Sequence, residues 1–205
     1  MLLAIFELAS EVAEGDLTAL DSGLLRWMRS LTGDHGLAVD VLRWITWLGN
    51  APMLVTVIAL ACLALLITRR FGRATILLVG TLSGAGMVTL MKYVVARPRP
   101  AVVAHLTNYG DLSFPSGHAA NSAIVYLAIA ELLAQLVPGL RLRAAILSAA
   151  VLLAVAVGLS RLFLGVHWPT DVLAGWVFGA SWALLCWTVG WWWRARNMRA
   201  MGSLR

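Results

Sequence analysis

The chain has 205 residues, of which 60% are hydrophobic and only 13% are charged, whereas an ordinary soluble domain carries about 25% charged residues. With a mean hydropathy of +0.83, this composition excludes a soluble globular protein and predicts an integral membrane protein. The net charge of +6 comes from short basic clusters between apolar runs, a pattern that argues against a nucleic-acid-binding patch.

The first 50 residues contain no obvious membrane span. Residues 1–14 are apolar but shorter than the roughly 20 residues that a spanning helix needs, so they predict a short N-terminal helix that is either a sixth span or interfacial. Asp21 is of a type preferred at helix N-caps and is expected to cap the next helix. Trp and Arg are mixed with apolar residues in 24–48, which favours helices lying in the membrane interface; packed connectors between spans are the alternative.

Five apolar runs are long enough to cross a membrane, and they predict an all-α, polytopic transmembrane helix bundle. They cover residues 51–68, 74–91, 119–137, 144–163 and 171–193. The second run carries small residues that favour close helix packing, namely Gly80, Ser83, Gly84 and Gly86. The whole chain, residues 1–205, is expected to form a single membrane-embedded domain.

Basic residues mark one side of the predicted bundle. Clusters at 69–73, 141–143 and 194–205 fall on the same side, which the positive-inside rule makes cytoplasmic. The connections at 92–118 and 164–171 then share the external side. Two stretches far apart in the sequence are therefore expected to meet at one external surface.

Cations also stand on the external side, against the usual orientation of positive charge. Lys92, the only lysine in the chain, begins the first external connection, Arg99 follows it, and Arg161 lies near the external end of its span. An anionic ligand explains this placement, because arginine binds phosphate through a planar fork of donors. Arg97 fits either such a site or anchoring to lipid headgroups.

Ser116, Gly117 and His118 stand where the third predicted span begins. Ser116 is a preferred N-cap residue, and Gly117 lets an anion approach the backbone closely. The free N–H groups of a helix N-terminus suit phosphate. His118 lies in the first turn and can move a proton near neutral pH. The sequence therefore predicts that this helix N-terminus, capped by Ser116, binds phosphate near Gly117 and that His118 has a functional role.

His167 and Asp171 lie four residues apart where the last span begins. A carboxylate at this spacing can reach one ring nitrogen, fix the tautomer and leave the other nitrogen as a nucleophile; capping of the helix by Asp171 is compatible with that role. Zinc ligation by His118, His167 and Asp171 is the alternative, but the surrounding cations would repel a dication and hold a phosphate. We therefore expect no metal and no other cofactor, and the isolated Cys62 and Cys186 add neither ligand spacing nor a disulfide framework.

Together these residues resemble the signature of a known family. Its three parts are Lys, six residues, Arg-Pro; then Pro-Ser-Gly-His; then Ser-Arg, five residues, His, three residues, Asp. They correspond in order and spacing to Lys92 with Arg99-Pro100, to Pro115-Ser116-Gly117-His118, and to Ser160-Arg161 with His167 and Asp171. The chain thus resembles the type 2 phosphatidic acid phosphatases, which are integral-membrane lipid phosphate phosphatases. The resemblance covers about residues 50–193, with the core signature at 92–171, and family members usually have six spans.

The resemblance implies a role for each matched residue. His167 would attack the phosphorus and form a phosphohistidine, and Asp171 would orient it. His118 would protonate the leaving lipid oxygen and then activate the hydrolytic water. The phosphoryl oxygens would be held by groups of Lys92, Arg99, Ser116, Gly117 and Arg161. No metal is required in such a mechanism.

The leading hypothesis is a metal-independent phosphatase that hydrolyses a lipid phosphate or diphosphate at the outer leaflet of a bacterial inner membrane. Undecaprenyl pyrophosphate, phosphatidylglycerol phosphate and phosphatidic acid are the candidate substrates, and the signature does not separate them because it contacts the phosphate and not the tail. The related haloperoxidases use such a site for vanadate, but they are soluble.

A non-enzymatic scaffold or transporter that binds an anionic lipid is the alternative. Its support is thin, because Glu131 is the only acid inside a predicted span apart from Asp171 at the start of the last one. Glu131 is expected in the cytoplasmic half as a packed or hydrogen-bonded residue. The expected partners are a lipid phosphate and membrane lipids, with no nucleic acid, and the sequence indicates no oligomeric state.

Overall fold

The computed structural model describes residues 11, 17–34, 36–107 and 112–202, which form seven α-helices. The helices are α2 (Thr18–Ser30), α3 (Leu37–Leu48), α4 (Ala51–Ile67), α5 (Phe71–Val95), α6 (Gly117–Ala134), α7 (Leu140–Phe163) and α8 (Pro169–Gly202). Helices α5 to α8 are each long and apolar enough to cross a membrane, and α3 with α4 adds a fifth span if this pair, bent by 45°, is one broken span. The predicted all-α membrane bundle is confirmed. The N-terminal stretch 1–14 lies outside the described residues apart from Glu11.

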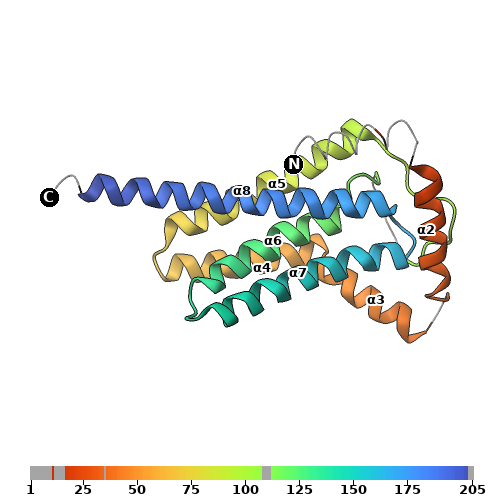
Figure 1. The fold of residues 1–205 in the computed structure, drawn as a ribbon, viewed down its shortest axis with the longest axis horizontal. Coiled ribbons are helices and arrows are strands. Elements are labelled where there is room, and N and C mark those ends of the chain that lie inside the picture. The colour runs from red at the N-terminus through yellow and green to blue at the C-terminus, as the bar shows by residue number, and fades with distance from the viewer. Residues whose placement is uncertain (1–10, 12–16, 35, 108–111, 203–205) are drawn as a thin grey trace.

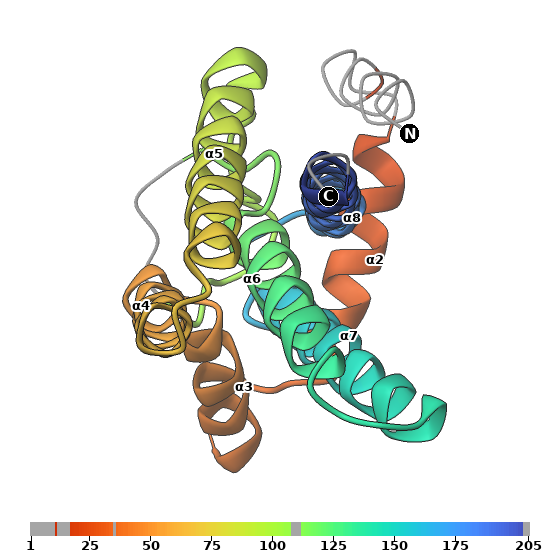
Figure 2. The same ribbon diagram turned by 90° about the vertical axis from the view of Figure 1, so that its left-hand side faces the viewer.

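Helix α6 is at the centre of the bundle, in contact with α4, α5, α7 and α8 (Figure 2). Glycines let α8 approach it closely: a Cβ added at Gly179 would lie 2.4 Å from the carbonyl oxygen of Ala120. One turn earlier, a Cβ at Gly175 would lie 2.8 Å from the carbonyl oxygen of Ser116. In a membrane, where lipid tails are as apolar as the side chains, such close backbone packing holds helices together.

The small residues predicted to form a packing face on α5 do so only in part. A Cβ added at Gly80 would lie 2.8 Å from the Cys186 sulfur, and one at Gly84 would lie 2.8 Å from Ile124 and Trp182 side-chain atoms. Gly86 has nothing within 4 Å, and Ser83 is exposed. The packing face of α5 therefore consists of two glycines, Gly80 and Gly84, which lie one turn apart.

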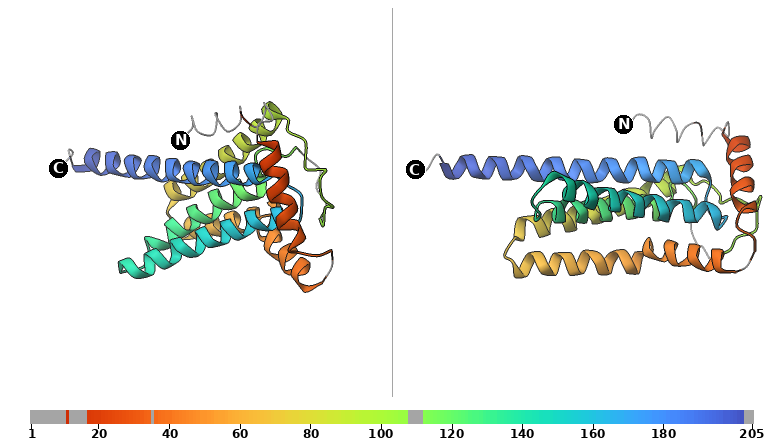
Figure 3. Two further views of the ribbon diagram at one scale, coloured as in Figure 1. Left: turned by 45° about the vertical axis from the view of Figure 1, so that its right-hand side comes forward. Right: turned by 60° about the horizontal axis from the view of Figure 1, so that its bottom comes forward.

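The helix ends are sorted as the sequence predicts. The turns α4–α5 and α6–α7, which carry basic clusters, lie at the end of the bundle from which α8 projects, and the connections α5–α6 and α7–α8 lie at the opposite end (Figures 1 and 3). With 34 residues at about 1.5 Å each, α8 is longer than the roughly 30 Å hydrocarbon core of a bilayer. Its last described basic side chain, Arg196, lies over the Trp192 ring at 4.5 Å.

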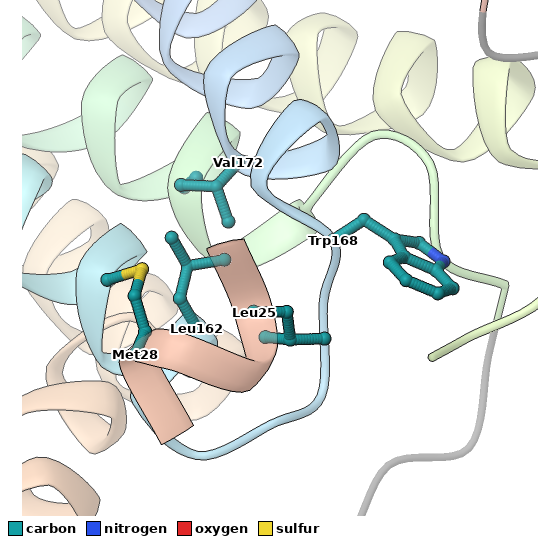
Figure 4. Packing of buried hydrophobic residues seen from close by; sticks show 6 residues of the cluster. Leu25, Met28, Leu162, Trp168 and Val172 are labelled. Carbon is teal, nitrogen blue, oxygen red and sulfur yellow. The ribbon is translucent and has the colours of Figure 1, made fainter. Parts of the chain in front are cut away.

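Helix α2 lies across the ends of α7 and α8 and not alongside them (Figures 1 and 3). Its inner face packs through Leu25 and Met28 against Leu162 of α7, against Val172 in the first turn of α8 and against Trp168 just before that helix (Figure 4). Its outer face exposes an apolar stripe, namely Leu20, Leu24, Trp27 and Leu31. Helix α2 is thus packed onto the bundle like a connector, while its outer face has the apolar character of an interfacial helix.

Asp21 does not cap α2, and the expected N-cap role is wrong. The helix begins at Thr18 with Leu17 in the cap position and no capping side chain. Asp21 lies within the first turn, is only 2% exposed, and accepts hydrogen bonds from Arg97 and Thr170. A charge-assisted hydrogen bond to a buried arginine stabilises a carboxylate more than a hydrogen bond to the N–H groups of an exposed helix end does.

The contact of α8 with α6 generates a stability prediction. Gly179→Ala should lower the free energy of unfolding by about 1–3 kcal/mol, because the added methyl group must displace the backbone of α6. Gly86→Ala is the matched control on α5 and should change it by less than about 1 kcal/mol, in the stabilising direction. Thermal unfolding in detergent measures both, and a Gly179→Ala protein as stable as the wild type would contradict the close contact.

Candidate active site

His167 is the centre of the polar end of the bundle and is only 1% exposed. Its Nδ1 lies 3.3 Å from Oδ2 of Asp171, and its Nε2 lies 3.1 Å from Nη1 of Arg99. A guanidinium only donates hydrogen bonds, so Nε2 carries the lone pair and Nδ1 carries the proton. The expected reach of Asp171 to one ring nitrogen is therefore present, and the other nitrogen faces a cation.

Local geometry explains why these two side chains meet. Pro169 begins α8, and Asp171 sits in its first turn with Oδ2 accepting from the backbone N–H of Trp168 at 2.9 Å. This back-bond to the residue before the helix is the carboxylate half of a capping box. Capping and orientation of His167 are thus carried out by the same oxygen.

Asp171 is completely buried, and further donors surround it. Ser113, in the connection between α5 and α6, donates from its hydroxyl to Oδ2 and lies 3.4 Å from Nδ1 of His167. Arg97 donates from Nη1 to Oδ1 at 2.7 Å. The carboxylate therefore has a donor on each oxygen, which holds its plane in place relative to the imidazole.

Arg97 is buried between two carboxylates, so neither expectation for it, a phosphate ligand or a headgroup anchor, fits the structure. Besides Asp171, it donates from Nη2 to Oδ2 of Asp21 at 2.7 Å, and its guanidinium lies over the Trp168 ring at 5.2 Å. Asp21 also accepts from the backbone N–H and the hydroxyl of Thr170, at 3.0 and 2.6 Å. Through Arg97, helix α2 is connected to the carboxylate that orients His167.

Lys92 and Gly117 lie side by side, since a Cβ added at Gly117 would be 3.7 Å from Cε of Lys92. The Lys92 ammonium donates to the carbonyl oxygen of Leu112. Both residues line a cavity of about 510 Å³, together with His118 and Asn121. The part of its wall formed by α4 and α5 includes apolar residues, so the cavity combines a cationic end with a surface that suits a hydrocarbon chain.

Ser116 is fully buried and caps α6, accepting from the backbone N–H of Ala119 at 3.5 Å. It does not line the 510 Å³ cavity. Its backbone N–H donates to the carbonyl oxygen of Asp171 at 2.9 Å. The predicted cap is confirmed, and this hydrogen bond joins the second motif directly to the third.

Arg161 and His118 are both held by α3 or by the residues that follow it. Arg161 is 3% exposed, and its Nη1 donates to the Thr46 hydroxyl at 2.8 Å. His118 has its Nε2 2.6 Å from Oδ1 of Asn50, in the break between α3 and α4. Lys92, Arg99, His118, Arg161 and the His167–Asp171 pair all lie at the end of the bundle that carries the α5–α6 and α7–α8 connections.

Sequence reasoning missed the supporting residues of this site. They are Asp21, Thr46, Asn50 and Ser113, together with the supporting role of Arg97. Each belongs to a type that is common in loops and helix ends, and none lies at a spacing from the motifs that could single it out. A signal was present only for Arg97, a second arginine close to Arg99 on the side that the sequence predicts to be external.

Two further expectations can be compared with the described part of the chain. Glu131 is half-buried and accepts from Nε2 of Gln135 at 2.8 Å, so the expected hydrogen-bonded role is confirmed. Within the described residues, no group of three or more His, Cys, Asp or Glu side chains is arranged to hold a metal ion, and Cys62 and Cys186 are free thiols.

Comparisons with known proteins agree with this geometry. A family profile described as the PAP2 superfamily matches residues 73–195. The chain is 33% identical over 141 residues to phosphatidylglycerophosphatase B from Bacillus subtilis, covering 68% of this chain and 69% of that protein. It is 36% identical over 98 residues to an undecaprenyl-diphosphatase from Sulfolobus acidocaldarius, covering 44% of this chain and 42% of the other.

The fold has a counterpart among solved structures. It resembles the crystal structure of a transmembrane PAP2-type phosphatidylglycerolphosphate phosphatase from Bacillus subtilis, with a TM-score of 0.84 and 28% identity over 92% of both chains. Because the family profile matches more than half of its length, this multi-span membrane protein belongs to the PAP2 superfamily, whose related phosphatases act on lipid phosphates.

Proposed function

We propose that the protein hydrolyses a lipid phosphate or diphosphate through a phosphohistidine formed on His167. The observation that carries this proposal is the hydrogen-bonding of His167, whose Nδ1 faces the buried Asp171 and whose Nε2 faces Arg99. A neutral imidazole held in this tautomer is a nucleophile at Nε2, and Asp171 stabilises the charge that develops on the ring as it attacks. Arg99 stands where a phosphoryl group would have to approach.

The phosphoryl oxygens would be held by cations and backbone donors around that point. Arg99, Lys92 and Arg161 supply positive charge, and the N-terminus of α6 at Gly117 supplies N–H groups. Ser116 contributes by capping α6 and by its bond to the backbone of Asp171, which aligns the anion site with the nucleophile. Donors fixed in advance around the developing charge are the main source of catalysis in phosphoryl transfer.

The reaction would proceed in two balanced steps. In the first, Nε2 of His167 forms a bond to phosphorus, the bond to the lipid oxygen breaks with its electron pair on that oxygen, and His118 gives the oxygen a proton. In the second, water gives a proton to His118 and attacks phosphorus, and the P–N bond breaks with its electrons returning to His167. Asp171 orients the ring throughout.

The side chains around the site favour a mechanism without a metal. Charge neutralisation, which a dication provides in many phosphatases, would come from the three cations of the site. Residues 1–205 would act as a single phosphatase domain, because the signature residues of 92–171 come from helices that share one packed bundle.

The leaving lipid group would lie in the 510 Å³ cavity that His118 lines, whose apolar wall suits a hydrocarbon chain. Undecaprenyl pyrophosphate, phosphatidylglycerol phosphate and phosphatidic acid remain the candidates. Relatives named as a phosphatidylglycerophosphatase and an undecaprenyl-diphosphatase support the first two. A panel of the three, assayed at equal mole fraction in detergent, separates them by kcat/KM.

The site would face the outside of a bacterial inner membrane. The support is the separation of charge along the bundle: the clusters at 69–73 and 141–143 lie at the end opposite the site, and positive clusters favour the cytoplasm. Substrate would then enter from the outer leaflet.

Phosphate release from lipid phosphates should persist in EDTA, because no step of the proposed reaction passes through a metal. The measurement is phosphate released by the purified protein from phosphatidic acid or phosphatidylglycerol phosphate, with and without EDTA. Complete loss in EDTA would contradict the metal-free mechanism. A protein that binds these lipids but releases no phosphate would instead be the scaffold or transporter.

His167→Ala should abolish turnover, by at least about 10⁴-fold, since the nucleophile is removed. His105→Ala is the matched control: it removes an imidazole of the other connection at this end of the bundle, between α5 and α6, that contacts the carbonyl oxygen of Pro100 and takes no part in the proposed reaction. Rapid quenching with radiolabelled substrate should trap an acid-labile phosphoenzyme in the wild type and the control. An active His167→Ala protein would overturn the nucleophile assignment.

Asp171→Asn should lower kcat by about 10²–10⁴-fold with a smaller effect on KM, because the imidazole tautomer is no longer fixed while the phosphate ligands remain. Asp40→Asn, at an exposed acid of α3 with a side chain 63% accessible, is the control and should leave kcat unchanged. Wild-type turnover in Asp171→Asn would reduce this carboxylate to a helix cap.

A further inference from the structure

The break between α3 and α4 contacts His118 through a residue outside the three motifs. Asn50 occupies the N-cap position of α4, where an Asn side chain ordinarily accepts from a backbone N–H of the helix. It makes no such bond. Its Oδ1 lies 2.6 Å from Nε2 of His118 instead, on a different helix and 68 residues away in the sequence.

The surrounding contacts hold this break firmly against α6 and α7. A Cβ added at Gly49 would lie 2.4 Å from Cγ1 of Val157 and 3.3 Å from Cδ2 of His118, so only glycine fits here without displacing a neighbour. The Tyr126 hydroxyl of α6 donates to the carbonyl oxygen of Leu48 at 2.6 Å. Two independent hydrogen bonds from α6 therefore hold this region, one at Leu48, the last residue of α3, and one at Asn50, just before α4.

The chemistry of the Asn50 contact decides which nitrogen of His118 carries a proton. An amide oxygen only accepts hydrogen bonds, so Nε2 of His118 must be the donor. In the neutral ring Nδ1 then carries the lone pair, and in the protonated ring Nδ1 carries the proton that can be given away. This mirrors His167, whose tautomer is fixed by Asp171, but with the two nitrogens exchanged.

We propose that Asn50 is a positioning residue that holds His118 in the tautomer needed to transfer a proton through Nδ1. This inference rests on the proposed function, in which His118 serves first as an acid and then as a base. As the P–O bond breaks, its electron pair goes to the lipid oxygen, which takes the Nδ1 proton. In the second step the water proton returns to Nδ1, while Asn50 keeps its bond to Nε2–H throughout.

A role in proton transfer has a consequence that a purely structural role lacks. An alkoxide leaves phosphorus with difficulty unless it is protonated, whereas a nitrophenolate is stable enough to leave without a proton. Misplacing the acid should therefore slow the cleavage of alkyl phosphates far more than that of aryl phosphates. Loss of folded protein, or loss of phosphate binding, would lower both to the same degree.

The experiment compares kcat/KM for phosphatidic acid and for 4-nitrophenyl phosphate, because this parameter reports the steps up to departure of the leaving group. Asn50→Leu, which keeps the size of the side chain and removes the acceptor, should lose about 10- to 100-fold on phosphatidic acid and less than about threefold on the aryl ester. Tyr126→Phe removes the other hydrogen bond of the same break and should show no such difference between the substrates.

His118→Ala, measured with the same two substrates, distinguishes the positioning role of Asn50 from the acid role of His118. If His118→Ala shows the difference between substrates and Asn50→Leu does not, the positioning role of Asn50 is overturned while the proposed mechanism stands. If His118→Ala itself affects both substrates equally, the acid role of His118 fails, and with it the inference. An equal fall on both substrates in Asn50→Leu alone would make Asn50 a structural residue.

Discussion

The ion pairs of Arg97 with Asp21 and Asp171 hold the polar end of the bundle together. All three side chains are almost completely buried, and a buried carboxylate without a partner is strongly destabilising. One guanidinium compensates both acids and so connects α2, the α5–α6 connection and the first turn of α8. Because Asp171 also contacts His167, the transverse helix α2 supports the position of His167, the proposed nucleophile, although it contributes no residue of the signature.

A second constraint, close backbone packing between α6 and α8, aligns the two halves of the site. Gly175 allows α8 to lie against the carbonyl of Ser116, and the Ser116 N–H donates to the carbonyl oxygen of Asp171. The N-terminus of α6, the proposed phosphate site, is therefore fixed relative to His167 by main-chain contacts, which are stiffer than side-chain ones. His167 and His118 are each held by a side-chain oxygen from another turn or helix, so the proposed site is organised without a ligand.

Features set by residues close together in the sequence were predictable, and features set by residues far apart in the sequence were not. The spans followed from apolar runs, and the position of the α5–α6 and α7–α8 connections at the same end of the bundle followed from counting those runs. The cap at Ser116 and the reach of Asp171 to His167 were predictable, because each is set within four residues. Asp21 was predicted as a cap and Arg97 as a ligand or headgroup anchor, because their partners lie about 75 residues away and no local pattern indicates them.

By itself, the sequence determined the all-helical membrane bundle, the family signature and which residue types could handle a phosphate, since hydropathy and short spacings act locally along the chain. Only the tertiary structure decided which groups support that chemistry. In that structure α2 lies across the end of the bundle, Arg97 is buried between Asp21 and Asp171, and Asn50 contacts His118. These contacts depend on how helices pack against each other, and a buried polar side chain takes whichever partner that packing presents.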